Sequence, residues 1–130
     1  MNRLRKLIRG TKGQSVVEFA LVVPLLMLII VAIIEFGRMW MTMNVITSAA
    51  YEGARVAAIT APSVTQATAA AQNVLTAARI NGAVITISGP NANGEVSCQV
   101  RLNYVPLTQG IIPGFGPRVL SQTATMHWEN

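Results

Sequence analysis

The chain has 130 residues, of which 52% are hydrophobic and 12% charged, and its formal net charge is +5. The length allows one modest domain, or a membrane anchor with a small domain, and the composition excludes a disordered chain and is unlike that of an ordinary cytosolic enzyme. Because Cys98 and His127 are the only cysteine and histidine, an intrachain disulfide, a multi-cysteine cluster and a His-pair zinc site are excluded.

The positive charge lies at the start of the chain. Residues 1–13 (MNRLRKLIRGTKG) contain five Lys and Arg and no acid, whereas the rest of the chain has five Arg and five Glu and sums to zero. The body therefore lacks the basic patch of a nucleic-acid-binding protein, and we expect no nucleic-acid partner. A basic segment directly before an apolar run instead holds that end in the cytoplasm while the run inserts into a membrane.

An apolar run follows, from Val16 to Ile34 (VVEFALVVPLLMLIIVAII). As a helix it spans about 28 Å, close to the hydrocarbon thickness of a bilayer. A chain of this length has too little protein to bury such a helix on all sides. We therefore expect a single-pass membrane protein with a cytoplasmic N-terminus and the bulk of the chain outside. The alternative is a cleavable secretory signal ending near Ala50, from which Glu35, Arg38 and Trp40 separate the run.

Glu18 and Pro24 are unusual residues for a helix that serves only as a membrane anchor. A carboxylate costs at least about 2.5 kcal/mol at the bilayer centre and less near an interface, so Glu18 either reaches the inner headgroups or pairs with a cation. Pro24 removes one helical hydrogen bond; it either loosens the helix or is tolerated, as membrane-helix prolines often are.

A cut after Gly13 would give Glu18 a cationic partner. It would remove the basic leader and create an α-amino group on Gln14, four residues before Glu18 and on the same helix face. The new ammonium could neutralise Glu18 within the subunit or on a neighbour. Gly13 suits a peptidase because it lets the backbone extend.

The helix is expected to continue to about Ile59 or Thr60, because Pro62 prevents it from continuing further. An apolar stripe with helical spacing supports this: Met39, Met43, Ile46, Ala50, Ala54 and Ala57. Glu52 and Arg55 have the spacing of a surface ion pair, whereas Glu35 and Arg38 lie at the outer membrane edge, where a pair could meet a second helix. Trp40 fits an interfacial anchor. A helix from Ser15 to Thr60 would be about 68 Å long, so its exposed part needs lipid and then other subunits.

A second, short helix begins after Ser63, which with Gln66 fits a capping box. Its expected apolar face is made of Val64, Ala67, Ala71, Val74 and Ala78. Asn81 and Gly82 are expected to end it. The small residues 67–71 predict close packing against the alanine-rich end of the first helix.

After Gly82 the apolar residues recur at every second position, which is typical of strands. We expect strands over 83–88, 96–104 and 119–128, with a turn at 90–94. The inward face of the middle strand includes Cys98, interpreted as a small buried hydrophobe. Residues 106–117 form a loop that either folds onto the sheet or docks a neighbouring subunit. The fold class is α+β: a long transmembrane helix, a short helix and a small antiparallel sheet of about three strands.

No pattern supports catalysis. The chain has no Asp, so a Ser-His-Asp triad is impossible. Cys98 and His127 could pair in principle, but an activated thiolate needs an exposed, electropositive setting. Phosphate-loop and dinucleotide fingerprints are absent from the sequence. We expect no enzyme activity, no cofactor and no metal.

The stretch GQSVVEF after a basic leader resembles the processing site of type IV prepilins. Three segments are similar to the TadE-like family of tight-adherence (Tad/Flp) pilus systems: 18–38 (EFALVVPLLMLIIVAIIEFGR), 49–58 (AAYEGARVAA) and the tail 104–129. The resemblance implies a pilin-like structural subunit, a minor pilin or pseudopilin, that supports pilus biogenesis and adhesion. It implies cutting after Gly13 by a prepilin peptidase and assembly in the bacterial inner membrane. The implied partners are other pilin subunits, the peptidase, the inner-membrane assembly platform and the lipid bilayer.

These expectations divide the chain into a leader (1–13), a transmembrane and extended helix (14–60) and an exterior domain (63–130). The processing residues are Gly13 and Gln14, and the assembly residues are Glu18, Pro24, Glu35 and Arg38. Two alternatives stay open: an uncut single-pass scaffold of a secretion or pilus assembly platform, and a soluble binding domain released by an ordinary signal peptidase.

Overall fold

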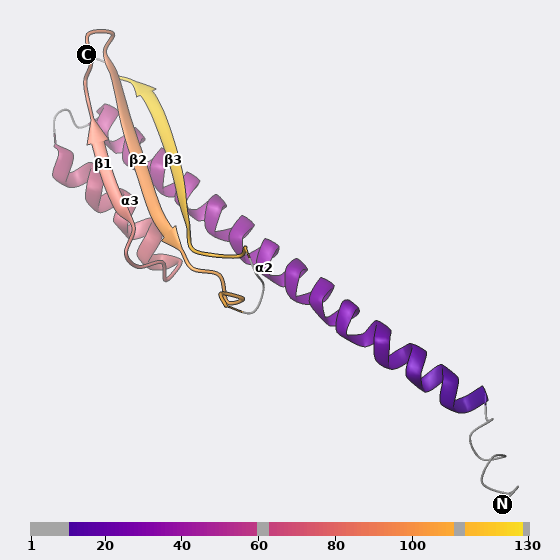
Figure 1. Cartoon of the computed structure of the whole chain (residues 1–130). Coiled ribbons are helices and arrows are strands. Elements are labelled where there is room, and N and C mark those ends of the chain that lie inside the picture. Colours follow the sequence, from indigo (N-terminus) through magenta and orange to yellow (C-terminus); the bar gives the residue numbers. More distant parts are fainter. Residues whose placement is uncertain (1–10, 60–62, 111–113, 129–130) are drawn as a thin grey trace, which may run out of the picture. The chain divides into compact units, whose positions relative to one another are not determined.

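The computed structural model describes residues 11–59, 63–110 and 114–128. Its elements, shown in Figure 1, are helices α2 (Thr11–Ile59) and α3 (Val64–Ala77) and strands β1 (Val84–Ser88), β2 (Glu95–Tyr104) and β3 (Arg118–His127). The chain divides into two units, Met1–Phe36 and Gly37–Asn130, here called the helical unit and the globular unit. This α+β arrangement of a long apolar helix, a short helix and three antiparallel strands confirms the predicted fold class.

The described part of the helical unit is the first part of α2. The helix begins at Thr11, four residues before the predicted Ser15, and therefore includes Gly13 and Gln14. It continues on both sides of Pro24. Its large apolar side chains from Val16 to Ile34 are exposed, except for the partly exposed Val23. By length and composition α2 qualifies as a candidate membrane span.

The last part of α2 belongs to the globular unit and contributes one face to its core. Of the predicted stripe, Ile46, Ala50, Ala54 and Ala57 are buried, and Met39 and Met43 are partly buried against the same core. The helix ends at Ile59, as the following proline predicted. The stripe and the end of the helix are thus confirmed, while Thr60 and Pro62 lie outside the described residues.

Helix α3 begins as predicted and ends earlier than predicted. The Ser63 hydroxyl oxygen accepts a hydrogen bond from the Gln66 backbone N–H at 3.3 Å, which confirms Ser63 as the N-cap. The helix ends at Ala77, because Arg79 adopts a left-handed conformation with φ of 57°. The Arg79 N–H then donates to the Thr76 carbonyl and the Ile80 N–H to the Leu75 carbonyl, both at 2.9 Å. This pattern is a Schellman motif, so the prediction that Asn81 and Gly82 end the helix was wrong.

The buried face of α3 consists of Ala67, Ala71 and Leu75. The prediction was right for the two alanines and missed Leu75. It was wrong for Val64 and Ala78, which are exposed. Val64 is the first residue of α3 and Ala78 is its C-cap, so both lie at the ends of the helix, beyond the buried residues between them.

The sheet has the order β1-β2-β3 with both pairs antiparallel. The alternation predicted for the middle strand is confirmed, since every second residue from Val96 to Tyr104 is buried. On β3, Leu120 and Ala124 are buried beside them, and on β1 Ile85 and Ile87 are partly buried. The predicted turn between β1 and β2 is held by Asn91, whose side-chain oxygen accepts from the N–H groups of Asn93 and Glu95 at 3.0 and 2.9 Å.

Gly53 marks the closest approach of α2 to the rest of the globular unit. A Cβ at this position would lie 2.6 Å from the Cys98 sulfur and 3.1 Å from the Ala71 Cβ. Cys98 comes from β2 and Ala71 from α3, so three elements meet where Gly53 has no side chain. The predicted close packing of α3 against the alanine-rich end of α2 is therefore confirmed.

Candidate functional site

The structure brings two of the predicted site residues together near the start of α2. The Gln14 side-chain amide donates a hydrogen bond to a Glu18 carboxylate oxygen at 3.3 Å, across one helical turn. Both side chains are exposed. Positions 14 and 18 therefore share one face of α2. The pairing of Glu18 with an α-amino group of Gln14 stays a prediction.

Gly13 precedes this pair and lies within the helix. It is exposed, and a Cβ built on it would meet nothing within 4 Å. Helical backbone is a poor protease substrate, so a cut here requires the first turn of α2 to unwind. Glycine eases that step, because it is about 1 kcal/mol less favourable than alanine in a helix interior.

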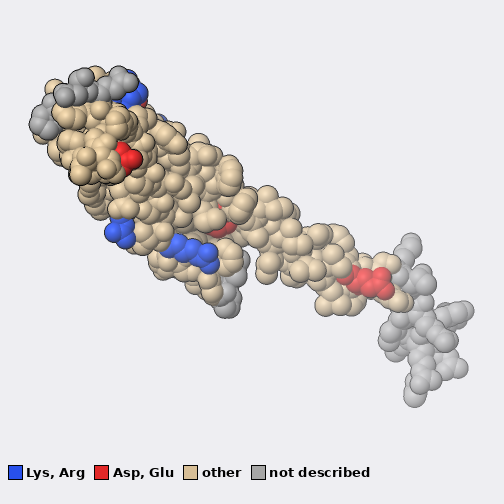
Figure 2. Space-filling view, turned by 90° about the horizontal axis from the view of Figure 1, so that it is seen from above, with Lys and Arg blue, Asp and Glu red and all other residues tan. Residues whose placement is uncertain are grey.

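The helical unit presents an apolar surface around the predicted assembly residues. Figure 2 shows this stretch as uncharged between its acidic side chains. Phe19, Leu21 and Ile33 are 67%, 74% and 65% exposed to solvent. Removing apolar surface from water stabilises by about 25 cal/mol per Å², so this helix favours lipid or other apolar helices over water. Pro24 lies in its interior and is also exposed.

Glu35 and Arg38 differ in exposure. Glu35 is buried, with 4% of its surface exposed, whereas Arg38 is exposed. Burial of a carboxylate is costly unless it is hydrogen-bonded or paired. The sequence signalled the unusual position of Glu35 at the end of the apolar run, but it did not predict burial. The assembly roles of both residues stay predictions.

Glu52 and Arg55 form the expected surface pair. The Arg55 guanidinium contacts both Glu52 carboxylate oxygens, at 2.6 and 3.0 Å; Arg55 is exposed and Glu52 is partly exposed. Exposed pairs of this kind contribute little to stability and hold no substrate. The interpretation of Glu52 and Arg55 as surface support is confirmed.

Cys98 and His127 do not form a catalytic pair. Cys98 is buried and points into the core, and burial raises the pKa of its thiol to about 11. His127 is exposed and lies opposite Glu95, whereas Cys98 lies opposite Ala124. Because the two residues differ by an odd number of register positions, they project from opposite faces of the sheet. The prediction that Cys98 is a small buried hydrophobe is confirmed.

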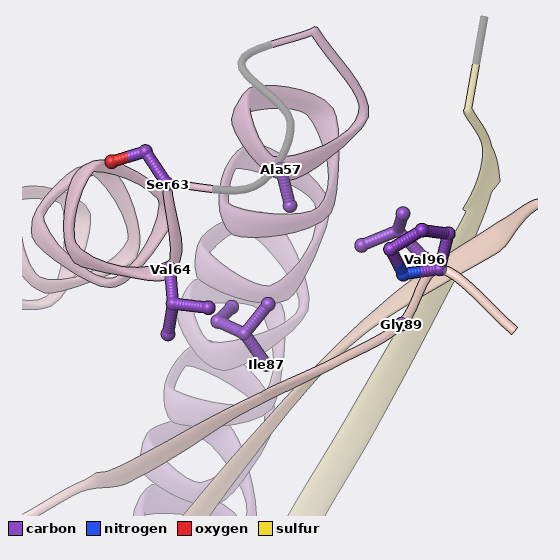
Figure 3. Close-up of a pocket in the computed structure, with 7 residues that line it drawn as sticks. Ala57, Ser63, Val64, Ile87, Gly89 and Val96 are labelled. Atoms are coloured by element: carbon purple, nitrogen blue, oxygen red, sulfur yellow. The ribbon is translucent and has the colours of Figure 1, made fainter. Parts of the chain in front are cut away.

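The cavity in Figure 3 is a packing gap between the N-terminus of α3, the end of α2 and the β1–β2 hairpin. Val64 and Ile87 approach it from one side and Val96 from the other, below Ala57. Its volume is about 20 Å³, close to that of one water molecule. It is too small for an organic ligand. Within the described residues no group of three His, Cys, Asp or Glu side chains is placed to hold a metal ion.

Sequence reasoning missed Gly53. Its signal was present, since a glycine stands inside a helix within an alanine-rich segment, where the neighbours alone give no reason for it. What the sequence could not supply was the partner, because Cys98 lies far away along the chain.

Comparison with known protein families gives a match that lies within α2. The family model described as TadE-like protein matches residues 13–55. No curated protein and no solved structure matches the chain. The matched residues begin at Gly13, include the apolar run with Glu18, Pro24, Glu35 and Arg38, and end at Arg55. Over this part of α2 the chain is similar to the TadE-like family, as the sequence resemblance predicted.

Proposed function

We propose that this protein is a minor pilin or pseudopilin of a Tad/Flp type IV pilus, cut after Gly13 and assembled through α2. The family match over residues 13–55 carries the proposal, because it covers the proposed cut and the whole apolar run. The bacterial inner membrane is the proposed location, with the N-terminus cytoplasmic and the globular unit outside. Partners are other pilin subunits, a prepilin peptidase and an inner-membrane assembly platform, and the role is support of pilus biogenesis and adhesion.

The exposed apolar surface of α2 supports this role. A membrane span that later leaves the bilayer for a filament must be accepted by lipid first and by other helices afterwards. Both environments bury apolar side chains without requiring polar partners, and the run from Val16 to Ile34 offers an apolar surface on all sides. Glu18 is the exception, and a charge at this depth needs a partner.

Processing supplies that partner. Before the cut, Glu18 accepts a hydrogen bond from the Gln14 side chain. After the cut, Gln14 carries an ammonium group one turn from Glu18, on the same subunit or presented to the next one. Glu18 then selects subunits that have been cut, since an uncut chain offers no ammonium at that position.

The Gly13→Asp variant tests the processing step. A side chain and a negative charge at the cut position should block cleavage, so an immunoblot of cells should show only full-length protein. The matched control is Gly10→Asp, which places the same charge in the leader but away from the cut. Normal-sized mature protein from Gly13→Asp would contradict the proposal.

One observation favours a second candidate function. Because α2 begins at Thr11, the proposed cut lies inside a helix. An uncleaved single-pass scaffold of a secretion or pilus assembly platform would keep this helix intact. Such a protein would keep its basic leader in cells, would be unaffected in size by Gly13→Asp, and would stay in the membrane fraction when pili are sheared off.

A further inference from the structure

Two Asn-Gly steps lie in the globular unit, at opposite ends of β1. Asn81-Gly82 precedes the strand in the link from α3, and Asn93-Gly94 lies in the turn between β1 and β2 (Figure 1). An asparagine side chain followed by glycine is open to attack by the next backbone nitrogen, because glycine has no side chain to hinder that nitrogen. The sequence offers both steps and does not distinguish them.

The turn at Asn93-Gly94 is held by hydrogen bonds. The Gly94 N–H donates to the Asn91 carbonyl oxygen at 2.9 Å. The N–H groups of Asn93 and Glu95 donate to the Asn91 side-chain oxygen at 3.0 and 2.9 Å. The Gly94 carbonyl oxygen accepts from the Trp128 N–H at 2.7 Å. Attack on the Asn93 side chain requires the Gly94 nitrogen to give up its proton and the backbone to turn, so these hydrogen bonds oppose it.

The link at Asn81-Gly82 is less restrained. Among the residues that the structure describes, neither the Gly82 N–H nor the Asn81 side chain has a hydrogen-bond partner. Both residues are exposed and lie outside the helices and strands. The Gly82 nitrogen can therefore approach the Asn81 side-chain carbon without the loss of a hydrogen bond.

The surroundings of the two glycines also differ. A Cβ built on Gly82 would meet nothing within 4 Å, whereas a Cβ built on Gly94 would lie 3.4 Å from the His127 ring carbon Cε1. Gly82 is exposed and Gly94 is half-buried. Because the His127 ring covers Gly94, water and hydroxide have less room at the nitrogen of Gly94 than at that of Gly82.

The neighbouring charges favour the same site. The attack passes through a nitrogen anion and then an oxyanion, which positive charges stabilise and negative charges destabilise. The exposed Arg79 precedes Asn81 by two residues, and the exposed Arg101 lines a hollow of the surface together with Gly82. In the turn between β1 and β2, by contrast, the acid Glu95 follows the glycine directly.

We propose that Asn81 is a site of spontaneous deamidation in the folded protein and that Asn93 is protected from it. The Gly82 nitrogen loses its proton to water or hydroxide and forms a bond to the Asn81 side-chain carbonyl carbon. The bond from this carbon to the side-chain nitrogen breaks, and that nitrogen takes a proton from water and leaves as ammonia. Water then opens the cyclic imide at either carbonyl group and gives aspartate or isoaspartate.

The conversion changes the charge and the backbone of the link between α3 and β1. Residue 81 gains a carboxylate, so residues 14–130, whose formal charges sum to zero, acquire a net negative charge. In the isoaspartate product the main chain runs through the former side chain, which lengthens it by a methylene group. Because Asn81 and Gly82 are exposed, the products alter the surface and leave the buried core in place. The modification therefore marks the age of a subunit.

Peptide mapping of the aged full-length chain tests the proposal. The protein is incubated in detergent at mildly alkaline pH and digested with trypsin, whose cuts after Arg79 and Arg101 release both asparagines on one peptide, residues 80–101. Fragmentation of this peptide assigns the mass increase of deamidation to residue 81 or to residue 93. Residue 81 should convert about tenfold faster, a difference of about 1.4 kcal/mol in the barrier. In guanidinium chloride, which unfolds the globular unit, the two rates should become similar.

Three variants separate the reactive site from the protected one. Asn81→Gln should abolish conversion at residue 81, because glutamine forms the larger cyclic imide much more slowly. Asn93→Gln is the matched control and should leave conversion at residue 81 unchanged. Asn91→Ala removes the side-chain oxygen that holds the turn, so it should speed conversion at residue 93 without changing the rate at residue 81.

Three results would overturn the proposal. Equal or faster conversion of residue 93 in the folded protein would show that the turn gives no protection. A folded protein in which neither residue converts, while the unfolded chain converts at both, would show that the link before β1 is not reactive. The same difference in rate with and without guanidinium chloride would show that the neighbouring residues in the sequence, and not the fold, set the two rates.

Discussion

Gly53 controls how closely α2 can pack against β2 and α3. The space for its missing side chain is taken by the sulfur of Cys98 and the methyl group of Ala71. In this part of α2 the small residues Ala49, Ala50 and Ala54 are also buried. Small side chains let the helix backbone approach the sheet, and the dense core leaves no room for an extra methyl group.

Gly53→Ala should destabilise the protein by about 1–3 kcal/mol, because the new methyl group would overlap the Cys98 sulfur. Chemical denaturation of the full-length chain measures the loss. Gly37→Ala is the matched control: it lies in the same helix, and its Cβ would meet nothing within 4 Å.

The double variant Gly53→Ala with Cys98→Ala locates the clash. Removing the sulfur should recover part of the lost stability, so the two substitutions should not be additive. Strict additivity, or a Gly53→Ala variant as stable as the parent, would show that α2 does not pack here as described.

Burial of the Cys98 thiol makes a prediction about pH. Its pKa in the folded protein is about 11, above that of a free cysteine. The thiol should therefore resist alkylation at pH 8 in the folded protein and react after unfolding. Because the unfolded chain loses this proton at lower pH than the folded chain, folding stability should fall as pH rises from the free-cysteine pKa toward 11. Rapid labelling at pH 8 without denaturant would contradict burial.

At the scale of elements, local patterns predicted the strands well. The period of two identified the middle strand, because a sheet with one buried face requires strict alternation. The start of α3 was also predictable, since Ser63 and Gln66 provide a local cap. These features depend on neighbouring residues along the chain, and such patterns are visible in a single sequence.

Features that depend on distant residues were harder to predict. The buried face of α3 includes Leu75 beside the partly buried Val74, and it is set by the elements that pack against it. α3 ends at Ala77 because Arg79 adopts a left-handed conformation, whereas the sequence favoured an end at the nearby Gly82. Within the candidate site, the Gln14–Glu18 spacing was predictable because it is local.

In α2, the proposed role in assembly depends on Gln14 and Glu18. Glu18→Ala should allow cleavage and reduce assembled pili on the order of tenfold, because an acid that pairs with the new amine is lost. Glu18→Gln should behave similarly, since it keeps the shape and loses the charge. Glu52→Ala, which removes an acid that pairs with Arg55 on the same helix, is the control. Counting pili by electron microscopy measures the effect, and unaltered numbers in Glu18→Ala would count against pairing.

At the scale of the whole molecule, the two units solve different physical problems. The globular unit buries its own core with one face of α2, α3 and the sheet. The helical unit leaves its apolar side chains exposed and so depends on surroundings outside the chain. Under the proposed function, a membrane would provide such surroundings for a newly made subunit, and neighbouring helices would provide them in a filament. The proposed cut after Gly13 links the two states by changing the charge at one end of the helix.

The most direct test is the N-terminal sequence of the protein isolated from cells that make it. The account predicts a mature chain that begins at Gln14, with the whole basic leader removed. A chain that still begins at Met1 would contradict processing and favour the uncut scaffold, and a start near Ala50 would contradict the membrane-helix account altogether.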